Sequence, residues 1–236
     1  MQRYKKLSET SEVRTGKFTK REAALMISEG VRHLHSSVEA DPDGVLTSEA
    51  LKRDSIPTYS WEQEERSHSI RLSSSSDRCA LAQNFLKATS LRRELREKSE
   101  SVLEELMTNA IYHGFTNADG SPRYARRATV QLNNSEELKI LCFPDEKGVF
   151  FRVTDNGGSL SFEDITQSFK RCYQKKELQI QSNEQGAGLG LYMIFEEVTH
   201  LKIVSRAGEQ TEVSCWIADQ RFGDTHTFSF NFFAAA

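Results

Sequence analysis

Three short stretches of the sequence carry residue types and spacings that could take part in chemistry. In the first stretch, Glu105, Asn109 and His113 are spaced four residues apart, so they would share one face of a helix. A carboxylate such as that of Glu105 can orient or deprotonate a nucleophile, and the amide oxygen of Asn109 can bind Mg²⁺. Taken alone, this pattern is more typical of a solvated polar stripe on a helix.

The second stretch places an acidic residue at the end of a predicted strand and two glycines after it, at Asp155, Gly157 and Gly158. A carboxylate in this place can accept a hydrogen bond from an exocyclic amine such as that of adenine. The glycines let the backbone turn tightly and admit a ligand close to the main chain. In isolation, the sequence Asp-Asn-Gly indicates no more than a β-turn.

The third stretch has glycines at alternate positions, Gly186, Gly188 and Gly190, and it opens a predicted apolar helix. Free backbone N–H groups at the start of a helix bind phosphate, and glycine lets the phosphate approach them. A Walker loop needs Gly-Lys-Ser/Thr, whereas Leu191 follows Gly190, and the dinucleotide fingerprint needs a strand immediately before the first glycine. The sequence therefore predicts a different type of phosphate loop.

From Ser67 onward, hydrophobic spacing predicts an α/β domain that places these stretches at the ends of helices and strands. The predicted helices cover residues 77–90, 93–113, 162–169 and 189–200, and the predicted strands cover 69–73, 128–132, 138–143, 149–154, 201–205, 211–217 and 226–233. The apolar stripe of the longest helix includes Val102 and Leu106. Short turns join the strands between residues 128 and 154, which favours a meander.

Residues 1–66 differ from the rest because they are rich in charge and poor in apolar pattern. One amphipathic helix is predicted over residues 19–38, after a capping box of the Thr-x-x-Glu type, and a short helix over about 47–51. Residues 54–65 have no apolar period and are interpreted as a linker. We therefore predict a helical N-terminal extension and linker over residues 1–66 and a second domain over 67–236.

The composition limits the class of protein. The chain has 236 residues, 37% of them hydrophobic, and a net charge of −3, which indicates one or two soluble domains with a core of ordinary size. No apolar run reaches the roughly 18 residues of a spanning helix, so we expect a cytoplasmic protein without a membrane partner. The slight acidity gives no overall attraction to nucleic acid, and no direct nucleic-acid partner is expected. The four cysteines are interpreted as reduced packing residues.

In this order, the three stretches resemble the motifs of the GHKL ATP-binding family, which includes histidine kinase catalytic domains, gyrase-type ATPases and the bacterial anti-sigma factor serine kinases. The resemblance covers about residues 67–218. It implies the Bergerat-type ATP-binding fold, an α/β (α+β) two-layer sandwich of a mixed, mainly antiparallel sheet with helices on one face. Here a short helical N-terminal region would precede that fold, and ATP and Mg²⁺ would be the cofactors.

The resemblance also implies roles for individual residues. Glu105 is similar to the catalytic glutamate, Asn109 to the Mg²⁺ ligand, and Asp155 to the residue that reads adenine. Gly157 is similar to the water-binding neighbour of that aspartate, and His113 is placed with the ATP-binding residues. The phosphate loop and the edge of the lid would be formed by Gly186, Gly188, Leu189 and Gly190.

Some positions leave alternatives open. Thr211 is similar to the threonine of the last motif, although Thr225 competes for that role. Ser159 stands where the second motif usually has another glycine, which affects the flexibility of the lid rather than adenine recognition. The lid, about residues 159–185, contains the basic residues Lys170, Arg171, Lys175 and Lys176. These charges could reach the polyphosphate, and a solvated basic loop is an equal alternative.

Other positions help to choose within the family. A histidine kinase normally has a helical hairpin with the acceptor histidine just upstream, and no hairpin is predicted here. His33 and His35 lie on the single convincing upstream helix and are interpreted as surface residues. Tyr112 stands where many histidine kinases have a basic residue. The sequence from Thr108 to Gly114 looks closest to the anti-sigma factor serine kinases.

Three hypotheses about function follow. The favoured one is a Mg²⁺-ATP-dependent regulatory protein kinase that transfers the γ-phosphate to a partner protein, at serine or threonine rather than histidine, with Glu105 as general base. The second is a nucleotide-gated binding module without transfer activity, and the third is a histidine kinase core that acts in trans. The partner would be a sigma factor, an anti-sigma antagonist or a phosphotransfer protein, and family likeness alone suggests a homodimer.

Overall fold

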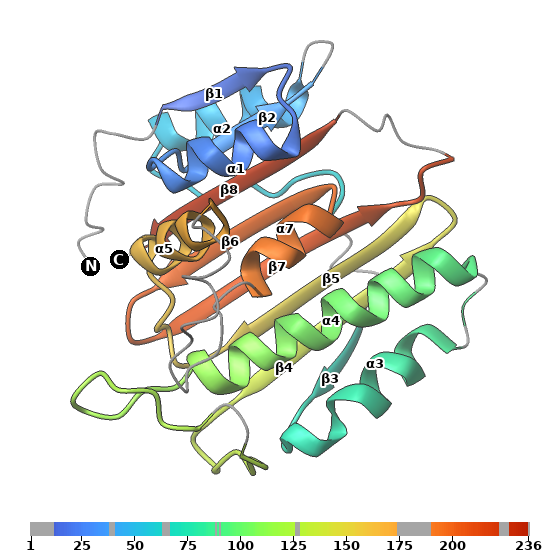
Figure 1. Ribbon diagram of the computed structural model, residues 1–236, viewed down its shortest axis with the longest axis vertical. Helices are drawn as coiled ribbons and strands as arrows, with labels where there is room; N and C mark the ends of the chain where they lie inside the picture. The colour runs from blue at the N-terminus through green and yellow to red at the C-terminus, as the bar shows by residue number, and fades with distance from the viewer. Residues whose placement is uncertain are drawn as a thin grey trace.

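The computed structural model describes residues 12–37, 41–62, 67–87, 89, 91–125, 128–173, 190–221 and 227–235. Its strands form one eight-stranded sheet in the order β1-β2-β8-β6-β7-β5-β4-β3 (Figure 1). They are β1 (Val13–Gly16), β2 (His33–Ser36), β3 (His68–Arg71), β4 (Leu138–Asp145), β5 (Gly148–Asp155), β6 (His200–Arg206), β7 (Gln210–Ala218) and β8 (Phe228–Ala235). β1 pairs with β2 and β6 with β8 in parallel, and the other neighbours are antiparallel. The predicted mixed, mainly antiparallel sheet is confirmed.

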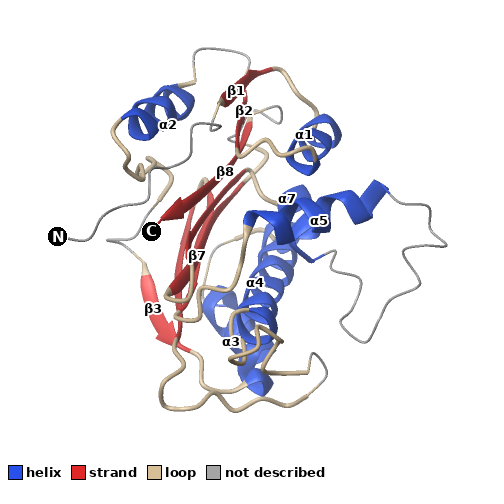
Figure 2. Ribbon diagram, turned by 90° about the vertical axis from the view of Figure 1, so that its left-hand side faces the viewer, coloured by secondary structure: helices blue, strands red, loops and turns tan. Residues whose placement is uncertain are grey.

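Helices cover this sheet mainly on one side. They are α1 (Lys20–Ser28), α2 (Pro42–Lys52), α3 (Arg78–Lys87), α4 (Arg93–His113), α5 (Phe162–Tyr173) and α7 (Gly190–Glu197), and a 3₁₀ turn at Ser75–Asp77 leads into α3. Figure 2 shows α1, α3, α4, α5 and α7 on one face of the sheet and α2 on the other. The predicted layer of helices is therefore present, and α2 adds a helix to the opposite face.

The long helix α4 runs along the strands and has the bounds predicted from the sequence (Figure 1). Its buried side chains include Val102, Leu103 and Leu106, which recur at the three- and four-residue spacing of one helix face. The helix ends at Gly114, whose N–H donates to the carbonyl oxygen of Ala110 at 3.1 Å. Because α4 packs against both β5 and α7, residues along it can meet each of these elements.

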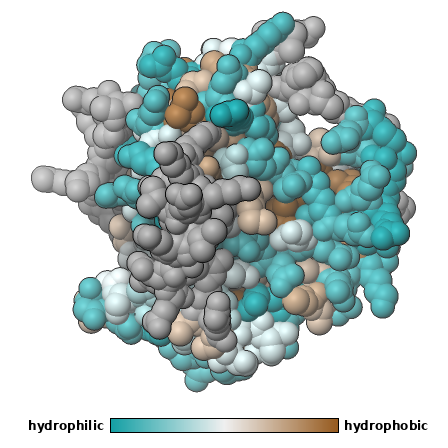
Figure 3. All heavy atoms as spheres, in the orientation of Figure 1, coloured by the Kyte–Doolittle hydropathy of each residue, from teal (hydrophilic) through white to brown (hydrophobic). Residues whose placement is uncertain are grey.

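The side chains of β5 alternate between two buried sides of the sheet. In β5, Val149, Phe151 and Val153 join the main core beneath the helices, whereas Phe150 and Arg152 face the other side of the sheet. This is the two-residue period expected for a strand. On the outside of the helix layer, hydrophilic residues cover most of the described surface (Figure 3). The sheet thus has an apolar side under the helices and a second side that is buried at β5 and β6.

The N-terminal region contains strands as well as helices. The helix predicted over residues 19–38 ends at Ser28, because Gly30 has a φ of +111°, which a right-handed helix does not allow. The chain then forms β2, which pairs with β8 so that Leu34 lies opposite Phe230. The helix prediction is wrong for this second half, since four residues of alternation were too few to stand out against the helical spacing before them.

Two further predictions differ from the structure. The helix expected from about residue 47 begins at Pro42, behind an N-cap in which the side chain of Asp41 accepts the next free N–H. The strand expected at 128–132 is absent from the described elements, and only an isolated bridge forms there at Gln131. The other predicted helices and strands are present, with bounds that differ by a few residues.

The segment interpreted as a linker contains side chains that are buried against the protein. Tyr59 and Trp61 are 2% and 7% exposed, and the carboxylate of Glu62 is buried in ion pairs with two cations of the sheet. Aromatic side chains in an irregular segment follow no period, so sequence patterns gave no sign of this packing. The division of the chain at residue 66 stays a prediction, although the sheet contains strands from both sides of it.

Candidate nucleotide-binding site

The end of β5 forms one part of the candidate site. Asp155 is 4% exposed, and its carboxylate accepts the backbone N–H groups of Gly157 at 3.0 Å and Gly158 at 3.1 Å. Burial raises the pKa of Asp155 to about 6, although these N–H groups favour the charged form. The turn after β5 therefore fixes the orientation of a buried carboxylate, which suits a residue that accepts a hydrogen bond from a base.

Thr211 lies beside Asp155, because the two residues are register partners in the β5–β7 pair. Thr211 is 3% exposed, and within the described residues its hydroxyl has no hydrogen-bond partner. A buried hydroxyl without a partner costs free energy unless a ligand or water satisfies it. Asp155 and Thr211 thus present two buried polar groups in one place. Thr225, the alternative to Thr211, lies outside the described residues.

The first and third sequence stretches meet where α4 contacts α7. A Cβ atom on Gly190 would lie 1.8 Å from Oε1 of Glu105, so this approach requires glycine. Gly190 is also the first residue of α7, which means that the N-terminal end of this helix lies directly against the Glu105 carboxylate. Glu105 and the end of the glycine-rich stretch are therefore neighbours in space, although 85 positions separate them in the sequence.

The opposite end of α4 touches the turn after β5. A Cβ atom on Gly157 would lie 1.9 Å from the carbonyl oxygen of Gly114, so the turn and the helix end are in close contact. The hydroxyl of Ser159 donates to the carbonyl oxygen of His113. The departure from the family pattern at Ser159 therefore adds a hydrogen bond between the start of the lid segment and α4.

α4 thus carries all three residues of the first stretch between these two contacts. Glu105 meets α7, Asn109 is half-buried one turn further on, and His113 is exposed near the end of the helix. From Glu105 to Gly114 the helix rises about 13 Å at 1.5 Å per residue. One helix therefore links a carboxylate at the start of α7 to the buried Asp155.

Comparison with known families agrees with this geometry. The family described as "Histidine kinase-, DNA gyrase B-, and HSP90-like ATPase" matches residues 95–221, which is more than half of the chain. The chain belongs to this family. The match contains Glu105, Asp155, Gly190 and Thr211, and it implies an ATP-binding domain of the kinase or regulatory ATPase type. No curated protein matched the chain.

Part of the ATPase site predicted from the sequence lies outside the described residues. This applies to Gly186, Gly188 and Leu189 of the phosphate loop and to Lys175 and Lys176 of the lid. The other two basic residues of the lid segment, Lys170 and Arg171, belong to the last turn of α5.

The donor set near Glu105 fits a magnesium ion of the kind that ATPases of this family use. Mg²⁺ usually takes only one or two protein ligands and completes its shell with water and phosphate oxygens. The half-buried amide of Asn109, one turn from Glu105, can supply one such ligand. Among the described residues, no group of three or more His, Cys, Asp or Glu side chains could hold a metal ion.

The structure gives the environments of the three residues considered in the choice of family member. His33 and His35 are each 1% exposed in β2, so the interpretation as surface residues is wrong. Their ring nitrogens contact the amide oxygen of Asn231 at 3.2 and 3.1 Å. The hydroxyl of Tyr112 donates to the carbonyl oxygen of Ala128 at 2.8 Å, which ties α4 to the following loop.

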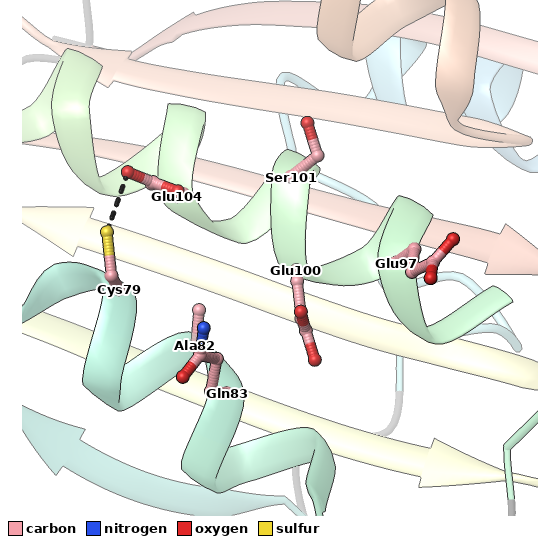
Figure 4. Close-up of a pocket in the computed structure, with 7 residues that line it drawn as sticks. All are labelled: Cys79, Ala82, Gln83, Glu97, Glu100, Ser101 and Glu104. Carbon is pink, nitrogen blue, oxygen red and sulfur yellow. Dashed lines mark hydrogen bonds between the residues drawn. The ribbon is translucent and has the colours of Figure 1, made fainter. Parts of the chain in front are cut away.

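A separate cavity of about 260 Å³ lies between α3 and α4 (Figure 4). Its lining residues are Cys79, Ala82, Gln83, Glu97, Glu100, Ser101 and Glu104. Glu104 accepts a hydrogen bond from Cys79 of α3, whereas its neighbour Glu105 faces α7. Because three carboxylates line this cavity, it would repel a polyphosphate, and it is distinct from the candidate site.

One residue near the site was missed entirely by sequence reasoning. Lys20 of α1 donates to carbonyl oxygens at the C-terminal end of α7, at Phe195 and Val198. The sequence holds no signal for this contact, because Lys20 looks like an ordinary charged residue in the first turn of an amphipathic helix.

Among the described helices, none combines the length and the apolar character that crossing a membrane requires.

Proposed function

We propose that this chain is a Mg²⁺-ATP-dependent regulatory protein kinase of the anti-sigma factor type, which transfers the γ-phosphate to a serine or threonine of a partner protein. The observation that carries the proposal is the contact between the carboxylate of Glu105 and Gly190, the first residue of α7. The start of a helix favours phosphate, so a carboxylate beside it is placed near the group to be transferred.

In this proposal the two ends of α4 have different tasks. At the adenine end, Asp155 accepts a hydrogen bond from the exocyclic amine, and Thr211 supplies the neighbouring buried hydroxyl. At the phosphate end, the N–H groups at the start of α7 bind phosphate oxygens and Asn109 provides a magnesium ligand. When bound, Mg²⁺ neutralises charge on the phosphates.

Glu105 acts as the general base. The hydroxyl oxygen of the partner's serine or threonine attacks the γ-phosphorus, the bond from that phosphorus to the departing ADP breaks, and the hydroxyl proton passes to the carboxylate of Glu105. Phosphoryl transfer depends mainly on positioning and charge neutralisation, which these groups supply. The burial of His33 and His35 supports a separate protein acceptor over transfer to the upstream histidines.

A second function, nucleotide-gated partner binding without transfer, is favoured by one observation. α1 packs against α5, and its Lys20 is bonded to α7, so the N-terminal region touches both elements that flank residues 174–189. If nucleotide binding shifts α5 or α7, the shift would pass directly to the N-terminal region. In this function the partner would be a sigma factor or its antagonist, held by contact alone.

Labelling with γ-³²P-ATP in a cell extract distinguishes these functions. We expect acid-stable phosphate on a partner protein, which Glu105→Gln abolishes while ATP binding persists. Glu104→Gln is the matched control, since Glu104 faces α3 and should leave labelling unchanged. Labelling that survives Glu105→Gln contradicts the role of Glu105. Acid-labile phosphate indicates a histidine kinase core in trans, and ATP-dependent capture without any label indicates the binding module.

A further inference from the structure

The ammonium group of Lys20 closes the C-terminal end of α7. Its Nζ donates to the carbonyl oxygens of Phe195 at 2.6 Å and Val198 at 2.7 Å. It also lies 4.2 Å from the ring centroid of Phe195 and 4.6 Å from that of Phe228, in cation–π geometry. Lys20 comes from α1, so a segment far away in the sequence supplies the cap of this helix.

This cap meets a specific need of α7. The last carbonyl groups of a helix have no partner within the helix, and a cation at that end also complements the helix dipole. Lys20 itself is held in place because it begins α1, where Thr19 and Glu22 form a capping box. The position of the ammonium group is therefore set by the folded N-terminal region.

Burial of this cation has a cost. It lowers the pKa of Lys20 to about 7, while Glu196 and Glu197 of α7 oppose the shift and Lys98 of α4 adds to it. A surface cap would satisfy the carbonyl groups with little desolvation. Because it is buried, the ammonium group bonds to the carbonyl groups of α7 rather than to water, and it thereby connects α1 to α7.

The two ends of α7 are close together, so they move together. The helix runs from Gly190 to Glu197, so its length is only about 10 Å at 1.5 Å per residue. A short, packed helix moves as a unit, and a shift at its C-terminal end also moves Gly190 relative to Glu105. The cap by Lys20 is thus linked to the phosphate end of the candidate site.

We propose that Lys20 is a positioning residue for the nucleotide phosphates, which holds α7 so that its first residue stays against Glu105. The N-terminal region then forms part of the working ATP site. This inference rests on the proposed function, because it requires that the chain binds ATP. It predicts an effect that is selective for phosphate, since the adenine end at Asp155 and Thr211 does not depend on α7.

Calorimetric titration of the full chain with Mg²⁺-ATP and with adenosine tests this selectivity. In Lys20→Met we expect the affinity for Mg²⁺-ATP to fall roughly tenfold and the affinity for adenosine to change less than about twofold. Lys52→Met is the matched control, because Lys52 ends α2 on the opposite face of the sheet and its loss should affect neither ligand. An equal loss for both ligands, or no loss for either, overturns the proposal.

The same titrations separate the failure of this inference from the failure of the proposed function. An unmutated chain that binds neither ligand contradicts the proposed function. An unmutated chain that binds both ligands, combined with an unselective Lys20→Met, contradicts only the role of Lys20. If Lys20→Met does not fold, Glu22→Ala loosens the capping box that holds Lys20. We expect a smaller loss that is again selective for Mg²⁺-ATP, and an unselective one overturns the proposal.

Discussion

The two buried sides of the sheet are held together by different physical forces. Under the helices, the sheet presents apolar side chains such as Phe151 of β5 and Ile203 of β6, and the candidate ATP site lies at the end of this side. On the other side, the same two strands present Arg152 and Lys202, which are 7% and 3% exposed. One side depends on buried apolar area, and the other depends on paired charges.

Glu62 is the centre of the charged side. Both of its carboxylate oxygens accept hydrogen bonds from Nζ of Lys202 at 2.7 Å, and one also pairs with Arg152. Nε of Arg152 donates to the hydroxyl of Ser214 at 2.9 Å, and Lys202 donates to the carbonyl oxygen of Pro57 at 3.2 Å. Buried charges are tolerated only when their partners are complete, so this side depends on each member of the network.

Aromatic rings complete the cover on this side. Trp61 is stacked between Tyr59 and His200, with ring centroids 5.4 Å apart in both pairs. The hydroxyl of Tyr59 lies 2.8 Å from that of Thr47 in α2. Tyr59 and Trp61 therefore anchor the end of the segment 54–62 on the sheet. We therefore expect changes on the charged side to act on stability, and changes at the ends of α4 and α7 to act on nucleotide chemistry.

The largest effect is expected from Glu62→Gln. This change removes the carboxylate charge paired with buried Lys202 and one of the two carboxylate charges beside buried Arg152. We therefore expect the free energy of unfolding to fall by about 3–5 kcal/mol in urea denaturation. The candidate site lies on the other side of the sheet, so the affinity of the folded protein for ATP should stay the same.

Glu212→Gln is the matched control for this change. Glu212 also approaches Arg152, with 3.5 Å between Oε1 and Nε, but its side chain is 19% exposed. We expect a loss below about 1 kcal/mol there. Equal stability losses for the two variants would remove the distinction between the two sides of the sheet.

A smaller effect is expected from Gly190→Ala, which should raise the activation free energy of phosphate transfer and leave stability unchanged. The new methyl group would occupy the place of the Glu105 carboxylate, which is the flexible end of a side chain and can move away at little cost. We expect an almost unchanged melting temperature and a loss of about a hundredfold in phosphate transfer, the range for loss of a general base. The double variant with Glu105→Gln should be no slower than either single variant. Additive losses would show that the two residues act separately.

A further effect is expected from protonation of Asp155, which should lower the affinity for ATP about tenfold for each pH unit below its pKa. The pKa of this carboxyl is raised to about 6 by burial, and only the charged form accepts a hydrogen bond at both oxygens, so ATP affinity should fall as the pH drops below 6. Stability should change in the opposite direction. Because the folded state holds this proton more tightly than the unfolded state, the contribution of Asp155 to stability is lost as the pH rises from about 4 to about 6.

Titrations at several pH values check both trends. Asp155→Asn should bind ATP weakly and without this pH dependence. A constant affinity of the unmutated protein between pH 5 and 7, at roughly one unit on either side of this pKa, would contradict the part assigned to Asp155.

Elements on the apolar side could be predicted well from the sequence. α4 has the predicted bounds because its apolar residues recur at helical spacing over 21 residues and Gly114 ends the pattern. The β4–β5 meander was predicted because a polar turn separates two runs of β-forming residues. The roles of Glu105 and Asp155 followed from family motifs, which keep their spacing, and remain predictions until tested.

The charged side could not be predicted in the same way. Arg152 and Lys202 alternate with apolar residues along their strands, a pattern that normally indicates a solvent-exposed face. Their burial depends on Glu62, which comes from an irregular segment without any period. The same reason hid Lys20, because its partners are backbone carbonyl groups, which leave no trace in the sequence.

Calorimetric titration with Mg²⁺-ATP of the unmutated protein, Asp155→Asn and Asp145→Asn tests the central claim most directly. Asp145 is the matched control, because its carboxylate accepts N–H groups of Lys147 at 2.7 Å and Gly148 at 3.0 Å in the same kind of turn, at the other end of β5. We predict that Asp155→Asn weakens binding at least about tenfold and Asp145→Asn less than about twofold. Equal affinity in all three proteins, or no binding in any of them, would contradict an ATP site at the end of β5.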